Sequence, residues 1–355
     1  MNENLPNEPG WPGAAGANRW WVVVCGFLVV ASLVPLRAAA ALVETNVPLH
    51  LGFSSDVFAG INENDARAAL KIWVQTILSE NGLFVSPEPR VIEGGDAMLR
   101  AVRDKTVDAV TVTTEEYIQL RAPMGATSAI LGANAGRVSE EYLLLVPRDR
   151  NLRELKDLRG GSLVLLDSPR ASLASVWFET RLLQSGLGET RQFCSRVIQK
   201  TKLSQVVLPV FFHQADACVV TRRGFQTMVE LNPQVGRQLQ TLMTSPPLVP
   251  VVFAFRTDYT NLIRAQIEAR IRDVGATPAG QQFLTLFQCD KLEMARLSVL
   301  DDAFELLTTH ARLVAAVNPG VSAPPGVLPS SSANGTVVSS ETSTLSPAGK
   351  DKAQP

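Results

Sequence analysis

The sequence contains few of the residues that build metal and redox sites. Only three histidines and four cysteines occur among 355 residues, and neither type is spaced like a metal-binding motif. We therefore expect no metal site and no cofactor. Cys25 lies in an apolar run, and the other three cysteines allow at most one disulfide bond, because an odd number leaves one thiol over. We expect small, buried side chains at Cys194, Cys218 and Cys289.

Motifs for catalysis, nucleotide binding and nucleic-acid binding are also missing. No G-x-S-x-G turn, G-x-x-x-x-G-K loop or G-x-G-x-x-G loop occurs, so neither a serine hydrolase nor a nucleotide-binding subunit is indicated. The net charge is -1, and no Lys/Arg cluster is long enough to follow a phosphate backbone, which argues against a nucleic-acid partner. We do not expect an enzyme, because no acid–base pair can be named.

The composition does supply enough apolar material for well-packed cores. Hydrophobic residues make up 46% of the chain and charged residues 19%. A length of 355 residues is sufficient for two domains of ordinary size. We expect a globular protein that is a monomer.

An uninterrupted apolar run over residues 20–36 is followed by Arg37 and by four alanines at 38–41. This order is typical of a secretory signal peptide with its cleavage site. The alternative is an uncleaved membrane anchor, for which the run is near the lower limit of about 17 residues. Both interpretations make residues 1–41 a targeting segment and place the folded part outside the cytoplasm.

The composition changes at the other end of the chain. From residue 319 onwards Pro, Ser, Thr, Gly and Ala dominate. Such a segment buries too little apolar surface to offset the entropy lost on ordering. We predict a disordered tail over residues 319–355.

Between residues 47 and 315, segments typical of strands alternate with segments typical of helices. In residues 64–80, for example, Ala69, Trp73 and Ile77 recur at helical spacing, and Asn81-Gly82 is a stop signal. Such alternation predicts an α/β fold with largely parallel sheets. Strands are predicted at 49–53, 107–112, 142–146, 162–166, 217–220 and 249–255, and helices at 64–80, 96–103, from 114, 172–184 and 203–213.

The strands at 142–146 and 249–255 lie at the two ends of the second block of elements. We predict that the chain crosses to a second lobe at the first strand and returns at the other. Lobe 1 then comprises residues 47–145 and 250–315, and lobe 2 comprises residues 146–249. Two lobes joined in this way enclose a cleft and can close on a ligand by hinge motion.

Short strands repeatedly run into Ser- or Thr-rich turns that open helices, at Ser54, Thr113, Ser168 and Thr201. Helix N-termini carry unpaired N–H groups and the positive end of the helix dipole. Several of them meeting at one cleft would therefore hold an oxyanion. This pattern favours binding over catalysis.

Residues 151–164 (NLRELKDLRGGSLV) resemble the element that opens the second lobe of type II periplasmic solute-binding proteins. Other motifs, in order between residues 47 and 300, resemble the phosphate, phosphite and phosphonate group of that superfamily. These motifs are Gly52-Phe53-Ser54-Ser55, Val107-Asp108-Ala109, Thr113-Thr114-Glu115-Glu116-Tyr117, Asp167-Ser168-Pro169 with Ser172, Ala215-Asp216-Ala217, and SPPLVP at 245–250.

The resemblance implies an α/β, two-lobed type II fold with mixed sheets flanked by helices and two crossing hinge strands. It also implies that the protein captures a small phosphate- or phosphonate-like oxyanion for an ABC-type importer. In that group, hydroxyls and backbone N–H groups at helix starts hold the ligand oxygens. Carried over to this sequence, the ligand-binding residues are Ser54, Ser55, Thr113, Thr114, Tyr117, Ser168, Ser172, Thr201, Lys202 and Arg222.

Structural roles remain open for several of these residues. Thr113 and Glu116 also fit a capping box, and Glu115 beside Glu116 would repel an anion unless both point away. Tyr117 is equally suited to a helix core. Lys202 and Arg222 also fit solvated surface charges.

The sequence departs from the family where amine-binding groups would fall. Residues 220–223 contain no carboxylate, which disfavours an aminoalkylphosphonate and favours another anion paired with Arg222. Two alternative functions also stay open. One is a periplasmic sensory module for a membrane receptor or kinase, and the other is an enzyme evolved from the same fold.

Overall fold

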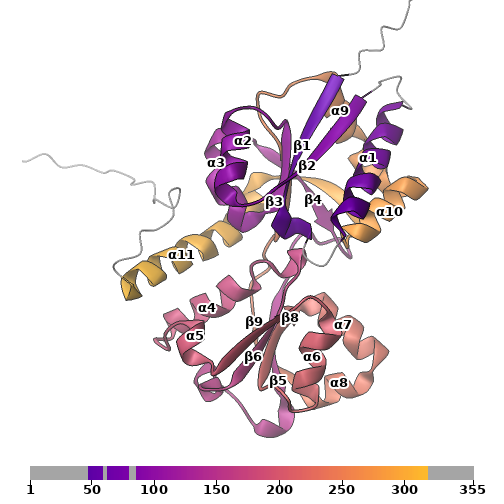
Figure 1. The fold of residues 1–355 in the computed structure, drawn as a ribbon. Helices are drawn as coiled ribbons and strands as arrows, with labels where there is room; N and C mark the ends of the chain where they lie inside the picture. Colours follow the sequence, from indigo (N-terminus) through magenta and orange to yellow (C-terminus); the bar gives the residue numbers. More distant parts are fainter. Residues whose placement is uncertain (1–46, 59–61, 80–84, 319–355) are drawn as a thin grey trace, which may run out of the picture. The chain divides into compact units, whose positions relative to one another are not determined.

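The computed structural model describes residues 47–58, 62–79 and 85–318 (Figure 1). The predicted targeting segment at 1–41 and the predicted tail at 319–355 lie outside these residues. Within the described part, none of the helices is long and apolar enough to cross a membrane.

The first sheet has six strands in the order β11-β4-β10-β3-β1-β2. β1 pairs in parallel with β2 and β3, whereas β10 pairs antiparallel with β3 and β4, and β11 antiparallel with β4. The strands are β1 Val47–Ser54, β2 Val85–Ile92, β3 Ala109–Thr113, β4 Ser128–Ala133, β10 Val251–Phe255 and β11 Lys291–Arg296.

The second sheet has five strands in the order β7-β6-β8-β5-β9. β6 is parallel to β7 and β8, and β5 is antiparallel to β8 and β9. The prediction of largely parallel sheets is therefore wrong, since each sheet mixes both kinds of pairing. The strands are β5 Tyr142–Pro147, β6 Ser162–Leu166, β7 Arg196–Lys200, β8 Ala217–Thr221 and β9 Leu239–Thr244.

Helices cover both faces of each sheet (Figure 1). The first sheet has α2 and α3 on one face and α1, α9 and α10 on the other, and the second has α4 and α5 opposite α6 and α8. The helices are α1 Glu63–Ser79, α2 Gly95–Arg103, α3 Thr114–Met124, α4 Ala174–Gln184, α5 Thr190–Phe193, α6 Leu203–Phe211, α7 Arg222–Leu231, α8 Pro233–Gln238, α9 Leu262–Arg270, α10 Pro278–Leu286 and α11 Asp301–Val317.

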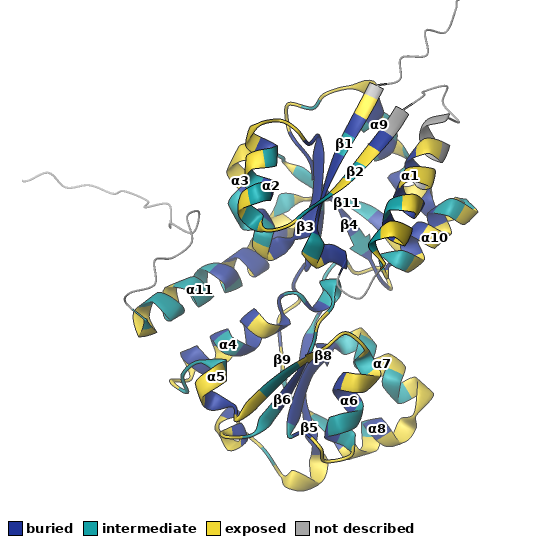
Figure 2. Ribbon diagram, in the orientation of Figure 1, coloured by how far each residue is buried: buried dark blue, intermediate teal, exposed yellow. Residues whose placement is uncertain are grey.

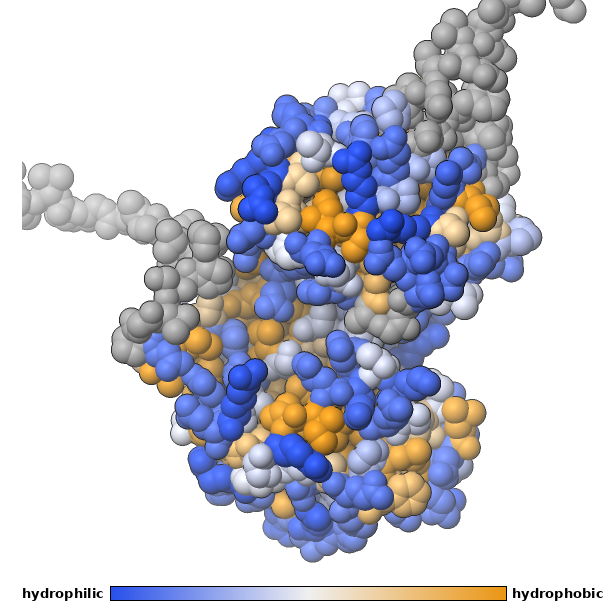
Figure 3. Space-filling view, in the orientation of Figure 1, coloured by the Kyte–Doolittle hydropathy of each residue, from blue (hydrophilic) through white to orange (hydrophobic). Residues whose placement is uncertain are grey.

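Alternation along β5 shows why the central strands are apolar throughout. All six of its residues are buried, because successive side chains enter different cores on the two faces. Leu144 and Val146 pack with Trp177 of α4, and Leu143 and Leu145 pack with the cluster beneath α6. Figure 2 shows the buried strands between helices whose outer faces are exposed, and Figure 3 shows mostly hydrophilic side chains over the drawn surface.

The architecture confirms the α/β fold class with mixed, helix-flanked sheets. The predicted strands and helices are present, with ends that differ by at most two residues from the expected ones. Strands β2, β4, β7, β9 and β11 were not predicted, because they carry more polar residues or lack a clear alternation.

Two short segments link the sheets, one from β4 to β5 and one from β9 to β10. They run side by side at an antiparallel bridge, in which Glu140 N–H donates to the Leu248 carbonyl at 2.7 Å and Leu248 N–H donates to the Glu140 carbonyl at 2.8 Å. β5 belongs wholly to the second sheet and β10 to the first. The crossings are therefore the segments at 134–141 and 245–250, which precede the strands expected from the sequence to cross.

Candidate functional site

A cavity of about 290 Å³ lies where helix starts from the two sheets meet, and we call it the serine-rich cavity. The first sheet contributes residues that follow β1 and end β3, and the second sheet contributes residues that follow β6. The lining residues are Ser55, Asp56, Thr113, Glu115, Leu165, Leu166, Asp167, Ser168, Ala171, Ser172, Ser175 and Gln199.

Thr113 forms the first-sheet side of this cavity as the N-cap of α3. Its hydroxyl accepts the Glu116 N–H at 3.3 Å, and its own N–H and hydroxyl each donate to Glu116 Oε2 at 2.9 Å. The other carboxylate oxygen of Glu116 accepts the Ser54 hydroxyl at 2.5 Å. The capping box is thus fully formed. Both carboxylate oxygens of Glu116 accept hydrogen bonds from the protein, so Glu116 does not face a ligand.

Ser168 and Ser172 form the second-sheet side, at the two ends of a short 3₁₀ helix, Pro169–Ala171, that leads into α4. Pro169 suits the first position of that turn, where its missing N–H costs nothing. Ser168 makes no capping hydrogen bond with its side chain. The Ser172 hydroxyl donates to the Pro250 carbonyl at 3.1 Å.

The serine-rich cavity is acidic. Asp56, Glu115 and Asp167 line it, and no Lys, Arg or His is among its lining residues. Loss of hydration raises the pKa of Glu115, and the neighbouring carboxylates Glu116 and Asp56 raise it further, against an opposing effect of His310. The charge of this cavity therefore disfavours a bare anion.

One larger cavity borders this one, and a second larger cavity borders the first of them. The first, of about 490 Å³, shares Ser168 and is lined by Thr201, Thr221, Arg170 and Arg223 among others. The second, of about 760 Å³, is lined by Arg222, Glu141 and Asp290. Both contain arginines that already have acidic partners.

The arginines in these larger cavities are paired. Arg222 donates to Glu141 at 2.8 Å, and Arg223 donates to both carboxylate oxygens of Asp290 at 3.1 and 3.2 Å. An anion would therefore compete with carboxylates for each of them.

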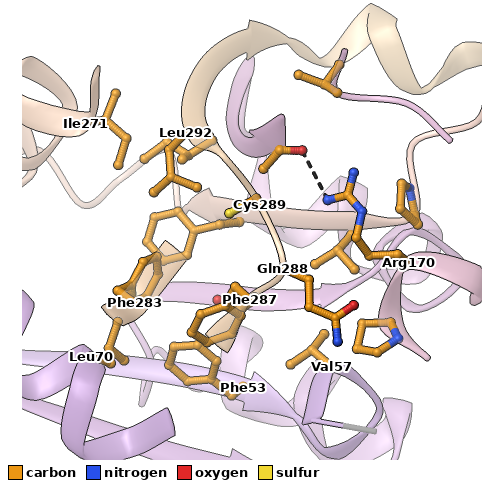
Figure 4. A pocket seen from close by; sticks show the side chains of 18 residues that line it. Phe53, Val57, Leu70, Arg170, Ile271, Phe283, Phe287, Gln288, Cys289 and Leu292 are labelled. Carbon is orange, nitrogen blue, oxygen red and sulfur yellow. Dashed lines mark hydrogen bonds between the residues drawn. The ribbon is translucent and has the colours of Figure 1, made fainter. Parts of the chain in front are cut away.

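A fourth cavity, of about 90 Å³, is apolar (Figure 4). Phe53, Phe283 and Phe287 face it together with Leu70, and Arg170 lies at one side, where its Nη1 donates to the Gly132 carbonyl at 3.3 Å. It is small and lined mainly by side chains of the first-sheet core. Such a lining does not suit a small polar solute.

The structure brings four of the predicted ligand-binding residues around the serine-rich cavity, namely Ser55, Thr113, Ser168 and Ser172. Thr201 lines the cavity of about 490 Å³ and Arg222 the cavity of about 760 Å³. Lys202 is exposed as the N-cap of α6 and is not among the lining residues of these three cavities.

The remaining predicted residues have buried side chains. Ser54 donates to Glu116, and the Thr114 hydroxyl donates to the Val249 carbonyl at 2.6 Å. Tyr117 of α3 is buried in the hydrophobic core, where loss of hydration raises the pKa of its phenol to about 12. These three residues hold the site together, and none of them is among the lining residues of the serine-rich cavity.

Sequence reasoning missed five polar residues of the site. Asp56 and Asp167 were available as direct neighbours of the predicted Ser55 and Ser168, and Glu115 had been noted only as a source of repulsion. Ser175 is the second residue of α4. Gln199 comes from β7, a strand that the sequence pattern did not reveal.

Several solved structures share this fold. A Xanthomonas citri protein bound to chloride ion has a TM-score of 0.55 at 19% identity, covering 76% of this chain and 99% of its own. The binding-protein component of an ABC phosphonate transporter from Pseudomonas aeruginosa has a TM-score of 0.52 at 15% identity, covering 78% and 91%. PhnD1 from Prochlorococcus marinus in complex with methylphosphonate has a TM-score of 0.51 at 14% identity, covering 73% and 96%.

The two-lobed fold and a family match together define a type II periplasmic binding protein. Residues 66–300 match the family described as ABC transporter, phosphonate, periplasmic substrate-binding protein, and the chain belongs to that family. It is a non-enzymatic periplasmic protein that binds a small ligand and delivers it to an ABC-transporter permease. Comparison with curated proteins gives no match.

Proposed function

We propose that this protein captures its solute in the serine-rich cavity. The observation that carries the proposal is the origin of the lining residues. Ser55 follows β1 and Thr113 ends β3, both in the first sheet, whereas Ser168 and Ser172 follow β6 of the second sheet. A solute in this cavity would contact both lobes at once, which is what a hinged binding protein requires of its ligand.

Ligand binding would be coupled to closure through the two crossing segments. They are linked by the Glu140–Leu248 bridge, and the carbonyls of Val249 and Pro250 accept hydrogen bonds from Thr114 and Ser172, one residue from each side of the cavity. A solute that contacts both sides stabilises the closed arrangement by its differential affinity for that state. The permease would then recognise the closed, loaded form.

The finer expectation is a small phosphate- or phosphonate-like oxyanion. The start of α4 and the hydroxyls of Ser168, Ser172 and Ser175 support it, because such groups hold oxyanions at helix N-termini. The carboxylates of Asp56, Glu115 and Asp167 oppose it. An oxyanion bound here would need to carry positive charge elsewhere in the molecule. The sensory alternative draws no support from the described residues.

The test is a thermal-shift screen of the full chain against anionic, neutral and cationic small solutes, followed by titration of each hit. A ligand that binds only the folded state raises its apparent stability, so a hit appears as a higher melting temperature. We expect the Ser168→Ala/Ser172→Ala double variant to bind the hit about a hundredfold more weakly, since each of the two lost hydrogen bonds to a charged group costs about 1.5 kcal/mol.

Lys202→Ala is the matched control, because Lys202 is exposed and outside the serine-rich cavity. We expect it to bind the hit as the parent does. A hit whose affinity is the same in the parent and in the double serine variant would place the binding site elsewhere and contradict the proposal.

A further inference from the structure

We propose that α11 connects the two lobes in addition to the two crossing segments, and that His310 on this helix is a positioning residue. When it is protonated, His310 stabilises the arrangement in which both lobes line the serine-rich cavity. This role concerns the movement of the lobes, and it holds whichever cavity takes the solute.

Helix α11 starts in the lobe of the first sheet and ends against the lobe of the second. It follows β11 through a short 3₁₀ helix, Leu297–Leu300, and it contacts both α3 of the first lobe and α4 of the second (Figure 1). Its buried residue Phe304 belongs to the hydrophobic cluster that also contains Tyr117 of α3 and Trp177 of α4. A rotation of one lobe against the other would therefore move α11 relative to α3 or to α4.

The first half of α11 is held to the first lobe. Its buried residues lie there, at Ala303, Phe304 and Leu307. The guanidinium carbon of Arg121 on α3 lies 5.2 Å from the centre of the Phe304 ring, which is a cation–π contact. Because α11 also continues directly from β11, we expect it to move with the first lobe.

The second half of α11 makes polar contacts with the second lobe. His310 Nε2 lies 3.0 Å from Glu179 Oε2 of α4, and these two side chains are only 22% and 27% exposed. The side-chain amide of Asn318, just after α11, donates to the carboxylate of Glu189, just before α5. If α11 moves with the first lobe, separation of the lobes breaks these hydrogen bonds.

His310 acts on a carboxylate from each lobe. The hydrogen bond with His310 lowers the pKa of Glu179 in the second lobe. In the first lobe, loss of hydration raises the pKa of Glu115, and the charge of His310 opposes that rise. A protonated His310 therefore attracts both carboxylates, whereas a neutral one keeps at most its hydrogen bond to Glu179.

This contact should respond to pH. Histidine is the side chain that ordinarily changes its charge between pH 5 and 8. Glu179 stays ionised over that range, because its pKa is lowered from a value that is already acidic. The attraction between α11 and α4 should therefore strengthen as the pH falls from 8 towards 5, and the lobes should separate less.

The test measures the distance between spin labels on the two lobes of the full chain, without a ligand. Arg103→Cys in α2 and Gln234→Cys in α8 supply the label positions, since both residues are exposed, whereas Cys194, Cys218 and Cys289 are buried. Pulsed electron resonance then gives the distance distribution at pH 8 and at pH 5.5. We expect the population with separated lobes to fall about threefold at the lower pH, as a partly buried ion pair would produce.

His310→Gln removes the titrating group and should abolish this pH response. Glu179→Gln keeps the shape of its side chain, removes the charge on the second lobe and should reduce the response strongly. The matched control is His213→Gln. His213 Nε2 lies 3.4 Å from Asp149 Oδ2, so it also faces a carboxylate, but both residues belong to the second lobe. This variant should respond to pH as the parent does.

Parent distances that are the same at both pH values would overturn the proposal. A full pH response in His310→Gln, or its loss in His213→Gln, would do so too. Because no ligand takes part in these measurements, their failure would leave the proposed binding site untouched.

Discussion

The Ser172 hydroxyl donates a 3.1 Å hydrogen bond to the carbonyl of Pro250, which also accepts the Thr114 N–H at 2.9 Å. One carbonyl of the returning segment therefore joins the start of α3 to the turn that leads into α4. The same residues were predicted from the sequence as ligand contacts. In this structure their hydrogen bonds hold the two sides of the cavity to a common segment.

We predict that Ser172→Ala lowers the free energy of unfolding by about 1 kcal/mol, because the Pro250 carbonyl oxygen then loses the hydrogen bond that the Ser172 hydroxyl donates to it. Ser168→Ala should have a smaller effect, since the Ser168 side chain makes no capping hydrogen bond. Urea denaturation of both variants without ligand measures the difference. Equal losses in the two variants would show that the Ser172 bond contributes nothing to stability.

A second prediction concerns Arg170 and Glu140. Nε and Nη2 of Arg170 lie 2.5 Å from Glu140 Oε1, with side chains only 12% and 7% exposed. Arg170→Met should destabilise the fold by about 3–5 kcal/mol, because it leaves a buried carboxylate without its partner. The double variant Arg170→Met/Glu140→Met should recover part of this loss.

Arg223 is the matched control for this pair. It forms an ion pair with Asp290, but both side chains are about half exposed, 48% and 51%. Arg223→Met should therefore cost no more than about 1 kcal/mol. Chemical denaturation measures the free energy of unfolding of the three variants. A similar loss of that free energy for Arg170→Met and Arg223→Met would contradict the prediction that the buried ion pair matters more than the exposed one.

The third prediction is a pH dependence at Glu115. The pKa of this carboxyl is raised in the folded state by loss of hydration, and by Glu116 and Asp56, with His310 opposing. A carboxyl with a raised folded pKa costs stability once pH rises above its unfolded value, because the folded protein then holds a charge that it disfavours. Glu115→Gln should therefore raise the melting temperature at pH 7.

This gain should disappear below about pH 4, where the wild-type carboxyl is protonated in both states and resembles the amide. Melting curves of the parent and the variant across this range test it. A stabilisation that stays constant down to pH 3 would arise from packing and not from ionisation.

The fourth prediction concerns export. The apolar run at residues 20–36 and the alanines at 38–41 predict a mature chain that starts near Leu42. Mass spectrometry of the exported protein measures its N-terminus. A mature protein that keeps Met1 and stays with the membrane would show that the run is an anchor.

The sequence alone determined the fold class and about half of the helices and strands, for a local reason. A strand such as Ser162–Leu166 lies between two helix-bearing stretches, and its apolar run and the turn residues around it are all close together in the chain. The Thr113 capping box was readable for the same reason, because both of its partners lie within one turn.

Tertiary structure alone decided how the strands pair and which groups face the cavity. β10 pairs antiparallel with β3 although more than a hundred residues separate them, and no local pattern specifies that partner. Likewise, Thr114 and Ser172 turn their hydroxyls to the returning segment, while Asp56, Glu115 and Asp167 come together from two sheets. Local sequence shows which residues can donate or carry charge. Only the packed chain determines which of those protons are already used and which charges meet, because hydrogen bonds and electrostatic interactions depend on distances in space and not along the sequence.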